Sequence, residues 1–574
     1  MWSAVPWLCR DVRGFKLLCA FAQAAKPYPV RVLIRRHVLK ILVSAVRFRP
    51  RPPEYENGRF GVRFCVWGFR LGIPLNTAPE NIHIATLLRR HLAALRSSAF
   101  IRCEITMRKA LTSILILAGV AATHAGAASP GTSNDPVQRR AVEAVIWGMP
   151  AVNTELMVQA MLRSTSAKEN EIVYWSEPVN WKNQTLTPNP DSIYFMSFVN
   201  TKVSGPLVID IPPAEGGSLA ANIVTTWQMP LEDAGPDGAD KGKGGKYLIL
   251  PPDYRDTPPE GYVVLRSDTY GGFALMRSNL ASHSEADVAK AVAYGKRVKI
   301  YPLSQASAPT PTRFTDAYDV PFDSTIRYDA SFFKTLNDVV QKEPWIQRDR
   351  VMIDQLKTLG IEKGKPYQPD ANMQKALDAA ARQANKELSA RYDLGFYRMV
   401  PEYRWFPAAM PEVIRAVSTG YGNVDEYPVD ARGVTYTLGF TGIKRIGTAQ
   451  FYLMVNKDKD GKALDGKQTY RLRVPANPPV KQYWSVTAYD RNTHALIRNV
   501  PRASVASTTT GVQKENDGVV EVYFGPKAPK GKEANWVSTD PKGSFELLFR
   551  LYGPEKPFFD KEWKLPDVER VSAR

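Results

Sequence analysis

The feature that most limits the fold of this chain is the apolar stretch at residues 107–129, which read MRKALTSILILAGVAATHAGAAS. A basic start, an apolar run and small residues before Ala128 are the layout of a secretory signal peptide, with a predicted cut between Ala127 and Ala128. The apolar run is too short to span a membrane. The alternative is a buried core helix, but the flanking charge and small residues favour a signal peptide. We therefore expect a periplasmic protein whose mature chain begins at residue 128.

Residues 1–106 differ in composition from the rest of the chain. They contain 15 Arg, 3 Lys and 5 acidic residues, together with all four cysteines. Most of the formal net charge of +19 therefore belongs to this part. One interpretation is a basic domain that contacts nucleic acid or a membrane. The other is a mis-assigned upstream extension that precedes the true start at Met107. Because signal peptides act at an N-terminus, we favour the second interpretation and expect no nucleic-acid partner.

The remaining chain, residues 128–574, has a nearly balanced charge and no cysteine. The lack of Cys excludes disulfides, thiolate catalysis and Cys–zinc sites from this part. Only His283 and His494 follow the signal segment, which excludes a multi-histidine metal site. No later segment is apolar enough for a membrane span, and we expect neither a metal nor a cofactor.

Short apolar runs in the first half of this part predict a β-rich domain. Residues 138–162 have helical spacing, with a break expected at Gly148 and Pro150. Strand-like runs and turns follow between residues 173 and 267. Ser284 is then placed to cap a helix that reaches about Val298.

The second half changes from helix to strand. Helical spacing extends over residues 331–418. After Pro428, short strand-like runs return, from TYTLGF (435–440) to FELLFRLY (545–552). Their close spacing predicts a compact antiparallel sandwich or jelly roll. The predicted fold class is therefore mainly β with a helical middle.

Two loops carry incomplete binding motifs. Residues 240–250, DKGKGGKYLIL, are similar to a phosphate loop but run into a strand instead of a helix, so we expect a Gly-rich hairpin. Residues 456–466, NKDKDGKALDG, place Asp458 and Asp460 at calcium-loop positions, but Lys467 stands where a bidentate Glu is needed. We expect a hairpin turn there, with a weak calcium site at Asp458 and Asp460 as the alternative.

The densest group of polar and aromatic residues lies in the first β region. Paired carboxylates near aromatic rings can perform acid–base chemistry on a sugar, although turn capping and packing explain the same residues. The candidates for this chemistry are Asp191, Tyr194, Glu232 and Asp233. His494 is a further candidate, with a structural role in a loop as the alternative. His283 is expected at a helix start, either capping it or exposed at the surface.

Longer motifs carry a family resemblance. Residues 147–150 (WGMP), 189–194 (NPDSIY), 205–212 (GPLVIDIP) and 227–252 resemble the N-terminal domain of unknown function 1254. Residues 483–497 (YWSVTAYDRNTHALI), 516–526 (NDGVVEVYFGP) and 550–557 (RLYGPEKP) resemble the C-terminal domain of unknown function 1214. The resemblance implies an Ig-like β-sandwich domain (138–300), an α-helical domain (314–426) and a C-terminal jelly-roll sandwich (430–574).

The resemblance supplies no catalytic residue, because the biochemical role of this family is not established as a class. We assign ligand binding to polar and aromatic residues within the two sets of motifs. These residues are Trp227, Gln228, Tyr489 and Arg491.

Three classes of function are consistent with these patterns. The first is a periplasmic protein that binds a small molecule or an envelope carbohydrate, since paired β-sandwiches commonly present aromatic grooves. The second is a hydrolase or lyase on an envelope or xenobiotic substrate, with Asp191, Glu232 or Asp233 as the acid or base and Tyr194 or His494 assisting. The third is a structural subunit of a homo-oligomer.

Overall fold

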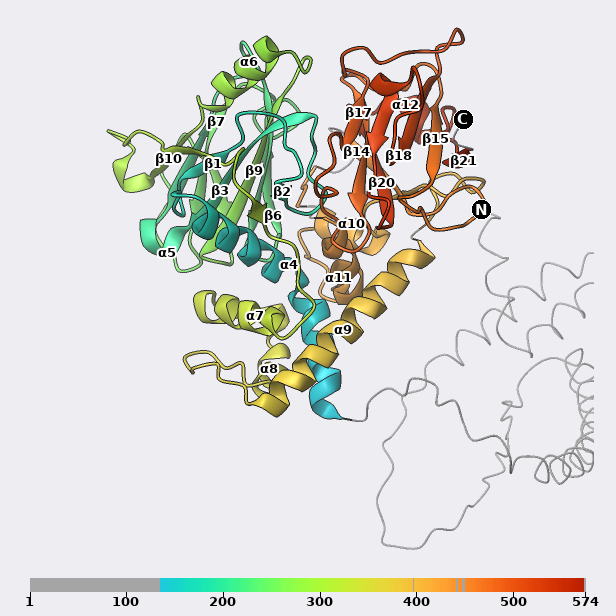
Figure 1. Cartoon of the computed structure of the whole chain (residues 1–574). Coiled ribbons are helices and arrows are strands. Elements are labelled where there is room, and N and C mark those ends of the chain that lie inside the picture. Colours follow the sequence, from blue (N-terminus) through green and yellow to red (C-terminus); the bar gives the residue numbers. More distant parts are fainter. Residues whose placement is uncertain (1–134, 396, 440–441, 446–449, 572–574) are drawn as a thin grey trace, which may run out of the picture. The chain divides into compact units, whose positions relative to one another are not determined.

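The computed structural model describes residues 135–395, 397–439, 442–445 and 450–571, which belong to one compact unit (Figure 1). The predicted extension (1–106), the signal peptide (107–127) and the cut at Ala127 and Ala128 lie outside the described residues. Among the described helices, none combines the length and apolar character that crossing a membrane requires.

The first described helix, α4 (Pro136–Ser164), begins at Asp135, whose side chain accepts a hydrogen bond from the Val137 amide. The break predicted at Gly148 and Pro150 is wrong, because α4 continues through both residues. An internal proline costs a helix about 3 kcal/mol. That cost is outweighed here because α4 is buried along most of its length and contacts α7, α8, α9 and α11.

The first β-sandwich consists of two sheets. The six-stranded sheet has the order β11 (Phe314–Asp316), β1 (Ile172–Tyr174), β3 (Ser192–Asn200), β9 (Gly271–Asn279), β5 (Leu219–Thr225) and β6 (Pro230–Ala234). The four-stranded sheet has the order β10 (Lys299–Pro302), β4 (Leu207–Ile211), β7 (Gly245–Leu250) and β8 (Val263–Arg266). Buried apolar side chains of both sheets, such as Phe195 and Ile249, form one core between them. A small third sheet pairs β2 (Asn183–Gln184) with β12 (Phe322–Asp323).

Two local predictions for this sandwich need correction. The Gly-rich loop before β7 joins β6 of one sheet to β7 of the other, so it is not a hairpin. The helix predicted to reach Val298 is α6 (Glu285–Gly295), which ends earlier. Its predicted cap is confirmed, because the Ser284 hydroxyl accepts a hydrogen bond from the amide of Asp287 at 3.3 Å. The short helix α5 (Thr201–Ser204) follows β3.

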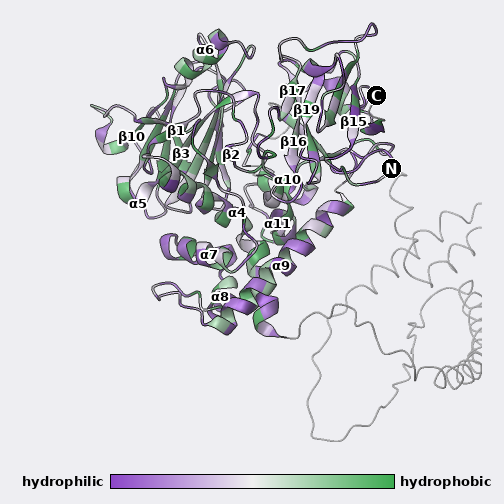
Figure 2. Ribbon diagram, in the orientation of Figure 1, coloured by the Kyte–Doolittle hydropathy of each residue, from purple (hydrophilic) through white to green (hydrophobic). Residues whose placement is uncertain are grey.

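The predicted helical middle is confirmed. It contains α7 (Ser331–Lys342), α8 (Met352–Thr358), α9 (Ala371–Leu394) and α10 (Pro411–Ser418). Buried residues recur on one side of α9, from Leu377 to Tyr392, as an amphipathic helix requires. Hydrophilic residues cover much of the rest of α9 (Figure 2).

The strand predicted for residues 435–440 is wrong, because residues 435–438 form the last turn of α11 (Val429–Leu438). This helix packs against α4 at Gly433. A side chain at Gly433 would lie 2.7 Å from Cγ2 of Ile146, so glycine allows the close approach. Residues 431–438 are all buried, and an apolar run of this length does not distinguish a buried helix from a strand.

The second β-sandwich also consists of two sheets. The five-stranded sheet has the order β13 (Phe406–Pro407), β14 (Gln450–Val455), β20 (Phe545–Tyr552), β16 (Trp484–Asp490) and β17 (Ser504–Ala506). The four-stranded sheet has the order β19 (Trp536–Ser538), β18 (Val520–Gly525), β15 (Thr469–Val474) and β21 (Glu569–Val571). A core of buried apolar residues fills the space between the sheets. The short helix α12 (Lys556–Phe559) packs against that core. The fold is therefore mainly β with a helical middle, as predicted.

Candidate functional site

A polar layer lies where the six-stranded sheet meets the five-stranded sheet. In the first sheet Tyr194 pairs with Arg277 across β3 and β9, and in the second Tyr452 pairs with Arg550 across β14 and β20. Directly paired residues project from the same face of a sheet. The two faces meet at Asn189, whose Nδ2 donates to the hydroxyls of Tyr483 (3.0 Å) and Tyr552 (2.8 Å).

We call this layer the tyrosine–arginine chamber. It comprises Arg277 and Arg550 with Tyr194, Tyr452, Tyr483, Tyr489 and Tyr552. Arg550 is 1% exposed, and Arg277 is 7% exposed. Tyr194, Tyr452 and Tyr552 lie close enough to act electrostatically on both guanidinium groups.

The two arginines differ in how well their donors are satisfied. Arg550 donates to Oγ1 of Thr487 (2.9 Å), the carbonyl of Thr187 (2.9 Å) and the hydroxyl of Tyr489 (2.6 Å). Arg277 donates from Nη1 to Oδ1 of Asn222 at 2.8 Å. Nε of Arg550 has no hydrogen-bond partner among the described residues, whereas Arg277 has no buried nitrogen without a partner.

Neither guanidinium of the chamber forms an ion pair with a carboxylate in the part of the chain that the structure describes. Burial raises the pKa of Tyr483, Tyr489 and Tyr552, so these hydroxyls are neutral at physiological pH. Burial lowers the pKa of Arg277 and Arg550, but the net shift in pKa is upward, so both guanidinium groups stay charged. The chamber therefore holds positive charge that its own residues do not neutralise.

A cavity of about 40 Å³ lies beside Arg277. Its polar walls come from Asn222, Asp233, Asp237 and Asn279 of the first sandwich, from Gln450, Gln482 and Tyr552 of the second, and from Arg445 between them. Asn279 follows Arg277 by two residues on β9, and Asn222 accepts its hydrogen bond, so Arg277 lies behind two of the residues that line the cavity. The cavity exists only because the two sandwiches meet.

Four of the predicted site residues lie in or beside the chamber. The Tyr194 hydroxyl accepts a hydrogen bond from the amide of Asn189 at 2.8 Å. Tyr489 donates to the carbonyl of Pro188 at 2.6 Å. Asp233 accepts from Nδ2 of Asn222 at 2.9 Å and from the Arg445 amide at 2.7 Å.

The fourth residue, Asp191, links the two sandwiches. Its Oδ2 accepts from the Ser504 hydroxyl of β17 at 2.8 Å, and its Oδ1 lies 3.4 Å from Nε2 of His283. The prediction that His283 only caps a helix or lies at the surface is therefore wrong, since its side chain is 23% exposed and contacts a buried carboxylate. The hydrogen bond that His283 donates to Asp191 raises the pKa of His283, while burial opposes that shift.

Glu232 lies at the outer edge of this region. It forms ion pairs with Lys444 (3.2 Å) and Arg445 (3.0 Å). Burial raises the pKa of Glu232, but the hydrogen bonds that it accepts from the Asp233 amide, Arg445 and Lys444 lower the pKa by a larger amount. The net shift in its pKa is therefore downward. Glu232 is thus an ionised carboxylate held by two cations, which does not suit the acid of the predicted acid-or-base role and leaves the role of a base as a prediction.

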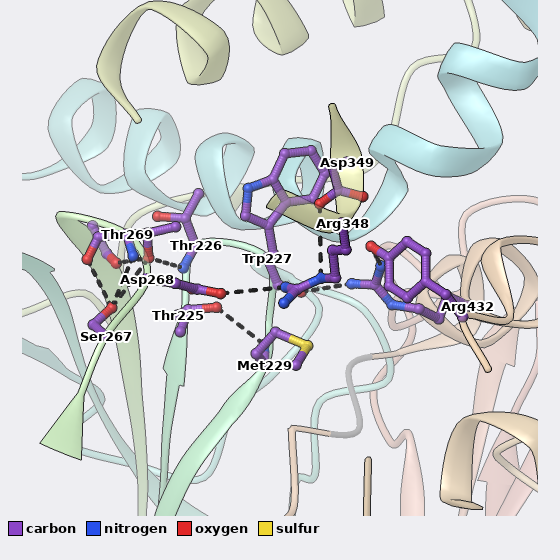
Figure 3. Close-up of polar contacts among 12 residues, drawn as sticks. Thr225, Thr226, Trp227, Met229, Ser267, Asp268, Thr269, Arg348, Asp349 and Arg432 are labelled. Carbon is purple, nitrogen blue, oxygen red and sulfur yellow. Dashed lines mark hydrogen bonds and ion pairs between the residues drawn. The ribbon is translucent and has the colours of Figure 1, made fainter. Parts of the chain in front are cut away.

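Trp227 lies elsewhere, beside a second group of charged residues (Figure 3), and Gln228 follows it in the chain. The Trp227 ring packs on Trp147 at a centroid distance of 4.5 Å, and Nε2 of Gln228 donates to Asn153 Oδ1 at 2.9 Å. We call the neighbouring charges the arginine–aspartate cluster, which comprises Arg348, Arg432, Asp268 and Asp349.

The arginine–aspartate cluster neutralises its own charge. Arg348 lies 3.3 Å from Asp268 and 3.8 Å from Asp349, and Asp349 also accepts from the Trp147 indole at 2.9 Å. Arg432 donates to the Trp227 carbonyl at 3.0 Å (Figure 3). Trp227 and Gln228 are buried inside this cluster, which gives them packing and hydrogen-bonding roles.

His494 and Arg491 occupy a third position. Nδ1 of His494 lies 2.6 Å from Oε1 of Glu546, and the Tyr392 hydroxyl donates to Oε2 of the same carboxylate at 2.7 Å. Arg491 pairs with Asp393 at 2.7 Å. His494 lies in a loop and is buried, in agreement with the structural alternative given above.

The calcium candidates form a tight turn. Oδ1 of Asp458 accepts from the amides of Asp460 (3.0 Å) and Lys462 (2.9 Å), and an antiparallel bridge joins Lys457 to Ala463. The flanking strands β14 and β15 belong to different sheets, so the turn is not a hairpin between them. Across the described ranges, no three His, Cys, Asp or Glu residues are grouped to hold a metal ion.

Five residues of the chamber and its contact were not predicted from the sequence: Asn189, Arg277, Tyr483, Arg550 and Tyr552. A signal for two of them was present in β20, where FELLFRLY places Glu546, Arg550 and Tyr552 on one face. Such alternation normally marks a face exposed to solvent. No comparable signal marks Arg277, because the facing sheet lies far away in the sequence.

Comparisons with known proteins support the two domain resemblances. Residues 169–302 match a family described as protein of unknown function (DUF1254), and residues 449–556 match one described as protein of unknown function (DUF1214). No curated protein matches the chain.

Two solved structures are similar to the chain. The VPA0106 protein from Vibrio parahaemolyticus is 19% identical, with a TM-score of 0.48, and the match covers 76% of this chain and 100% of that one. An uncharacterized protein from Burkholderia cenocepacia is 11% identical, with a TM-score of 0.35, and the match covers 76% of this chain and 95% of that one.

Proposed function

We propose that the protein is an exported binding protein of the cell envelope that holds a small polar molecule in the tyrosine–arginine chamber. One observation carries the proposal: a cavity lined by polar side chains from both sandwiches lies where their sheets meet. Ligand sites typically occur at such domain junctions and use a few converging polar groups. The signal-like segment at 107–129 supports export.

The size of the cavity limits the ligand. A volume of about 40 Å³ holds roughly three water molecules. A whole sugar ring has several times as many heavy atoms, so the cavity suits a compact molecule or one end of a longer one. This favours a small molecule over an envelope carbohydrate.

Native mass spectrometry of the protein from its host's envelope fraction tests the proposal. We expect a mass that starts at residue 128, together with extra mass that leaves on activation. Ala220 lines the cavity, so Ala220→Leu should fill it and remove the extra mass. Ala308→Leu, at an exposed position, is the matched control and should retain the extra mass. A bare mass from the wild type, with no shift in unfolding temperature by any small molecule, would contradict the proposal.

The contact between Asp191 and His283 favours a second candidate, a hydrolase or lyase. A buried carboxylate that holds one ring nitrogen of a histidine is the arrangement of an acid–base pair, in which the carboxylate orients the imidazole and favours its charged form. Nδ1 of His283 has no hydrogen-bond partner among the described residues. Asp191→Asn should then abolish turnover on a panel of ester and glycoside substrates while ligand binding persists. If the wild type turns over no substrate of the panel, the hydrolase or lyase proposal is contradicted and the proposal of a binding protein stands.

A further inference from the structure

We infer that the outer edge of β8 (Val263–Arg266) is a docking site for an extended, acidic peptide segment, which joins the four-stranded sheet as a fifth strand. This inference is independent of the proposed function, because the groove along β8 and the cavity of the chamber share no lining residue. Three observations carry it: the groove itself, the unused backbone of β8 and the charge of the groove.

A groove of about 730 Å³ follows β8. All four residues of this strand line it, and residues 230–232 of β6 line it from the facing edge. These two strands are terminal in their sheets and contact each other, so the groove lies at an open side of the first sandwich. Its lining also includes four residues drawn in Figure 3, namely Thr225, Met229, Asp268 and Arg348. The volume falls within the range of about 300–1,000 Å³ that is typical of ligand sites.

Strand β8 has unused backbone groups along this groove. It pairs in parallel with β7 on one side, from Val263 to Arg266. Among the described residues, no group forms a hydrogen bond to the backbone of β8 on its other side. An edge of this kind is a template for a further strand, and extended peptides dock on such edges through main-chain hydrogen bonds.

The neighbouring edges of the same sandwich are closed by the chain itself. Strand β6 begins at Pro230, which has no N–H, and the Leu231 carbonyl accepts from Nζ of Lys444 at 2.9 Å. At β10, the other terminal strand of the four-stranded sheet, the Ile300 amide donates to Oγ1 of Thr312 at 2.8 Å. The edge of β8 has no such cover in the described part of the chain, which makes it the edge that can accept a partner.

The side chains of β8 suit a half-buried strand beside it. Leu265 is buried in the core of the sandwich, and Val263 packs against the same core. Val264 and Arg266 alternate with them and therefore project to the other face, where Val264 is 38% exposed. An apolar side chain on an added strand would pack against Val264, since neighbouring strands stabilise each other through such pairs.

The charge of the groove selects an acidic partner. Its lining contains three cations and two carboxylates, which are Arg266, Arg348, Lys444, Glu232 and Asp268. The two carboxylates already have cations, because Arg348 lies 3.3 Å from Asp268 and Glu232 pairs with two basic side chains. Arg266 is exposed and forms no ion pair with a carboxylate of the described chain. A carboxylate of the peptide would pair with Arg266, and such complementarity favours acidic over basic segments.

Fluorescence anisotropy of the purified full-length protein with labelled hexapeptides tests the inference. The acidic probe is EVTVEV, which alternates polar and apolar side chains as a half-buried strand does. The basic probe is KVTVKV, and a third probe is EVTVEV with every internal amide N-methylated, which removes the donors and keeps the charge. We expect EVTVEV to bind at least about tenfold more tightly than either of the other probes. Hydrogen exchange of its complex should be slowed at the amides of residues 263–266.

Three variants locate the binding. Arg266→Glu should weaken the binding of EVTVEV at least about tenfold and strengthen that of KVTVKV, because it reverses the charge of the groove. Arg570→Glu is the matched control, since Arg570 is also an exposed arginine on a terminal strand, β21, and this variant should bind EVTVEV as the wild type does. Val264→Asp places a carboxylate on β8 and should also weaken binding, which serves if Arg266→Glu fails to fold.

A further variant separates this inference from the proposed function. Ala220→Leu fills the cavity of the chamber and should leave the binding of EVTVEV unchanged. Loss of the chamber's ligand would therefore contradict the proposed function alone, and loss of peptide binding would contradict the inference alone.

Four results would overturn the inference. EVTVEV does not bind, or the N-methylated or basic probe binds as tightly as EVTVEV does. Arg266→Glu binds EVTVEV as the wild type does. Sedimentation velocity shows a wild-type dimer that Arg266→Glu converts to a monomer, which would assign the edge of β8 to a second copy of this chain.

Discussion

The tyrosine–arginine chamber and the arginine–aspartate cluster use similar residues to different ends. Each contains two arginines that pack against tyrosine rings, with Arg550 5.4 Å from the Tyr452 ring and Arg432 5.1 Å from the Tyr427 ring. Only in the arginine–aspartate cluster does an arginine, Arg348, form ion pairs with carboxylates, at Asp268 and Asp349. The comparison teaches that burial of arginine alone does not indicate a ligand site.

The largest effect should come from removing an arginine of the compensated cluster. Arg348→Gln leaves Asp268 and Asp349 without their cation. Breaking a buried pair costs about 3–5 kcal/mol, and partial exposure of Asp268 reduces the expected loss to about 2–3 kcal/mol. Urea unfolding followed by circular dichroism would measure it. A loss below about 1 kcal/mol would mean that this cluster is not held by its ion pairs.

The second largest loss of stability should come from a change at the contact between the two sandwiches. Asn189→Ala removes the donors to Tyr483 and Tyr552 and the acceptor for the Asp191 amide. We expect a loss of about 2 kcal/mol in the free energy of unfolding, because buried hydroxyls lose their partner. Tyr452→Phe, which lacks a bond to Asn189, is the matched control and should cost less. Equal losses in the free energy of unfolding for the two variants would show that Asn189 does not join the two sandwiches.

A smaller, pH-dependent effect should arise at His283. The hydrogen bond with Asp191 raises its pKa in the folded state, and the nearby backbone of Pro190 and Thr508 acts in the same direction against burial. A raised pKa means that this contribution is fully present below the unfolded pKa and is lost as the pH rises through the folded one. Unfolding at several pH values should show a loss of about 1 kcal/mol on raising the pH. His283→Gln should abolish that slope.

The smallest effect should come from Arg277 and would sharpen the comparison most. In buffer without carboxylate or phosphate, Arg277→Gln removes a buried cation that has no counter-charge. We expect the free energy of unfolding to change by less than about 1 kcal/mol, or to increase. A loss as large as that of Arg348→Gln would show that the two clusters are both structural.

The strands and helices could be predicted where local pattern and tertiary packing agree. The strand FELLFRLY (545–552) is confirmed as β20, and Ser284 caps α6 as predicted. The continuity of α4 through Pro150 and the helical state of residues 435–438 were not predictable, because neighbouring helices decide both. Local propensity is a weak prior wherever a segment is buried on all sides.

The site was predicted only in part, for a similar reason. Asp191, Tyr194, Asp233 and Tyr489 do converge on the chamber. Arg277 and Arg550 were missed because each lies on a strand face that would be exposed if its sandwich stood alone. Both arginines are buried because two sheets that are distant in sequence contact each other. No local sequence pattern indicates that contact.

The packing of α4 also sets an order of events during synthesis. This helix comes first among the described elements, yet α9 and α11, which cover it, come far later in the chain. A growing polypeptide therefore presents the apolar side of α4 to its surroundings until the ribosome has released α11. The helical middle must therefore be translated before α4 can be covered. We expect chaperones that shield nascent chains to bind α4 during this interval.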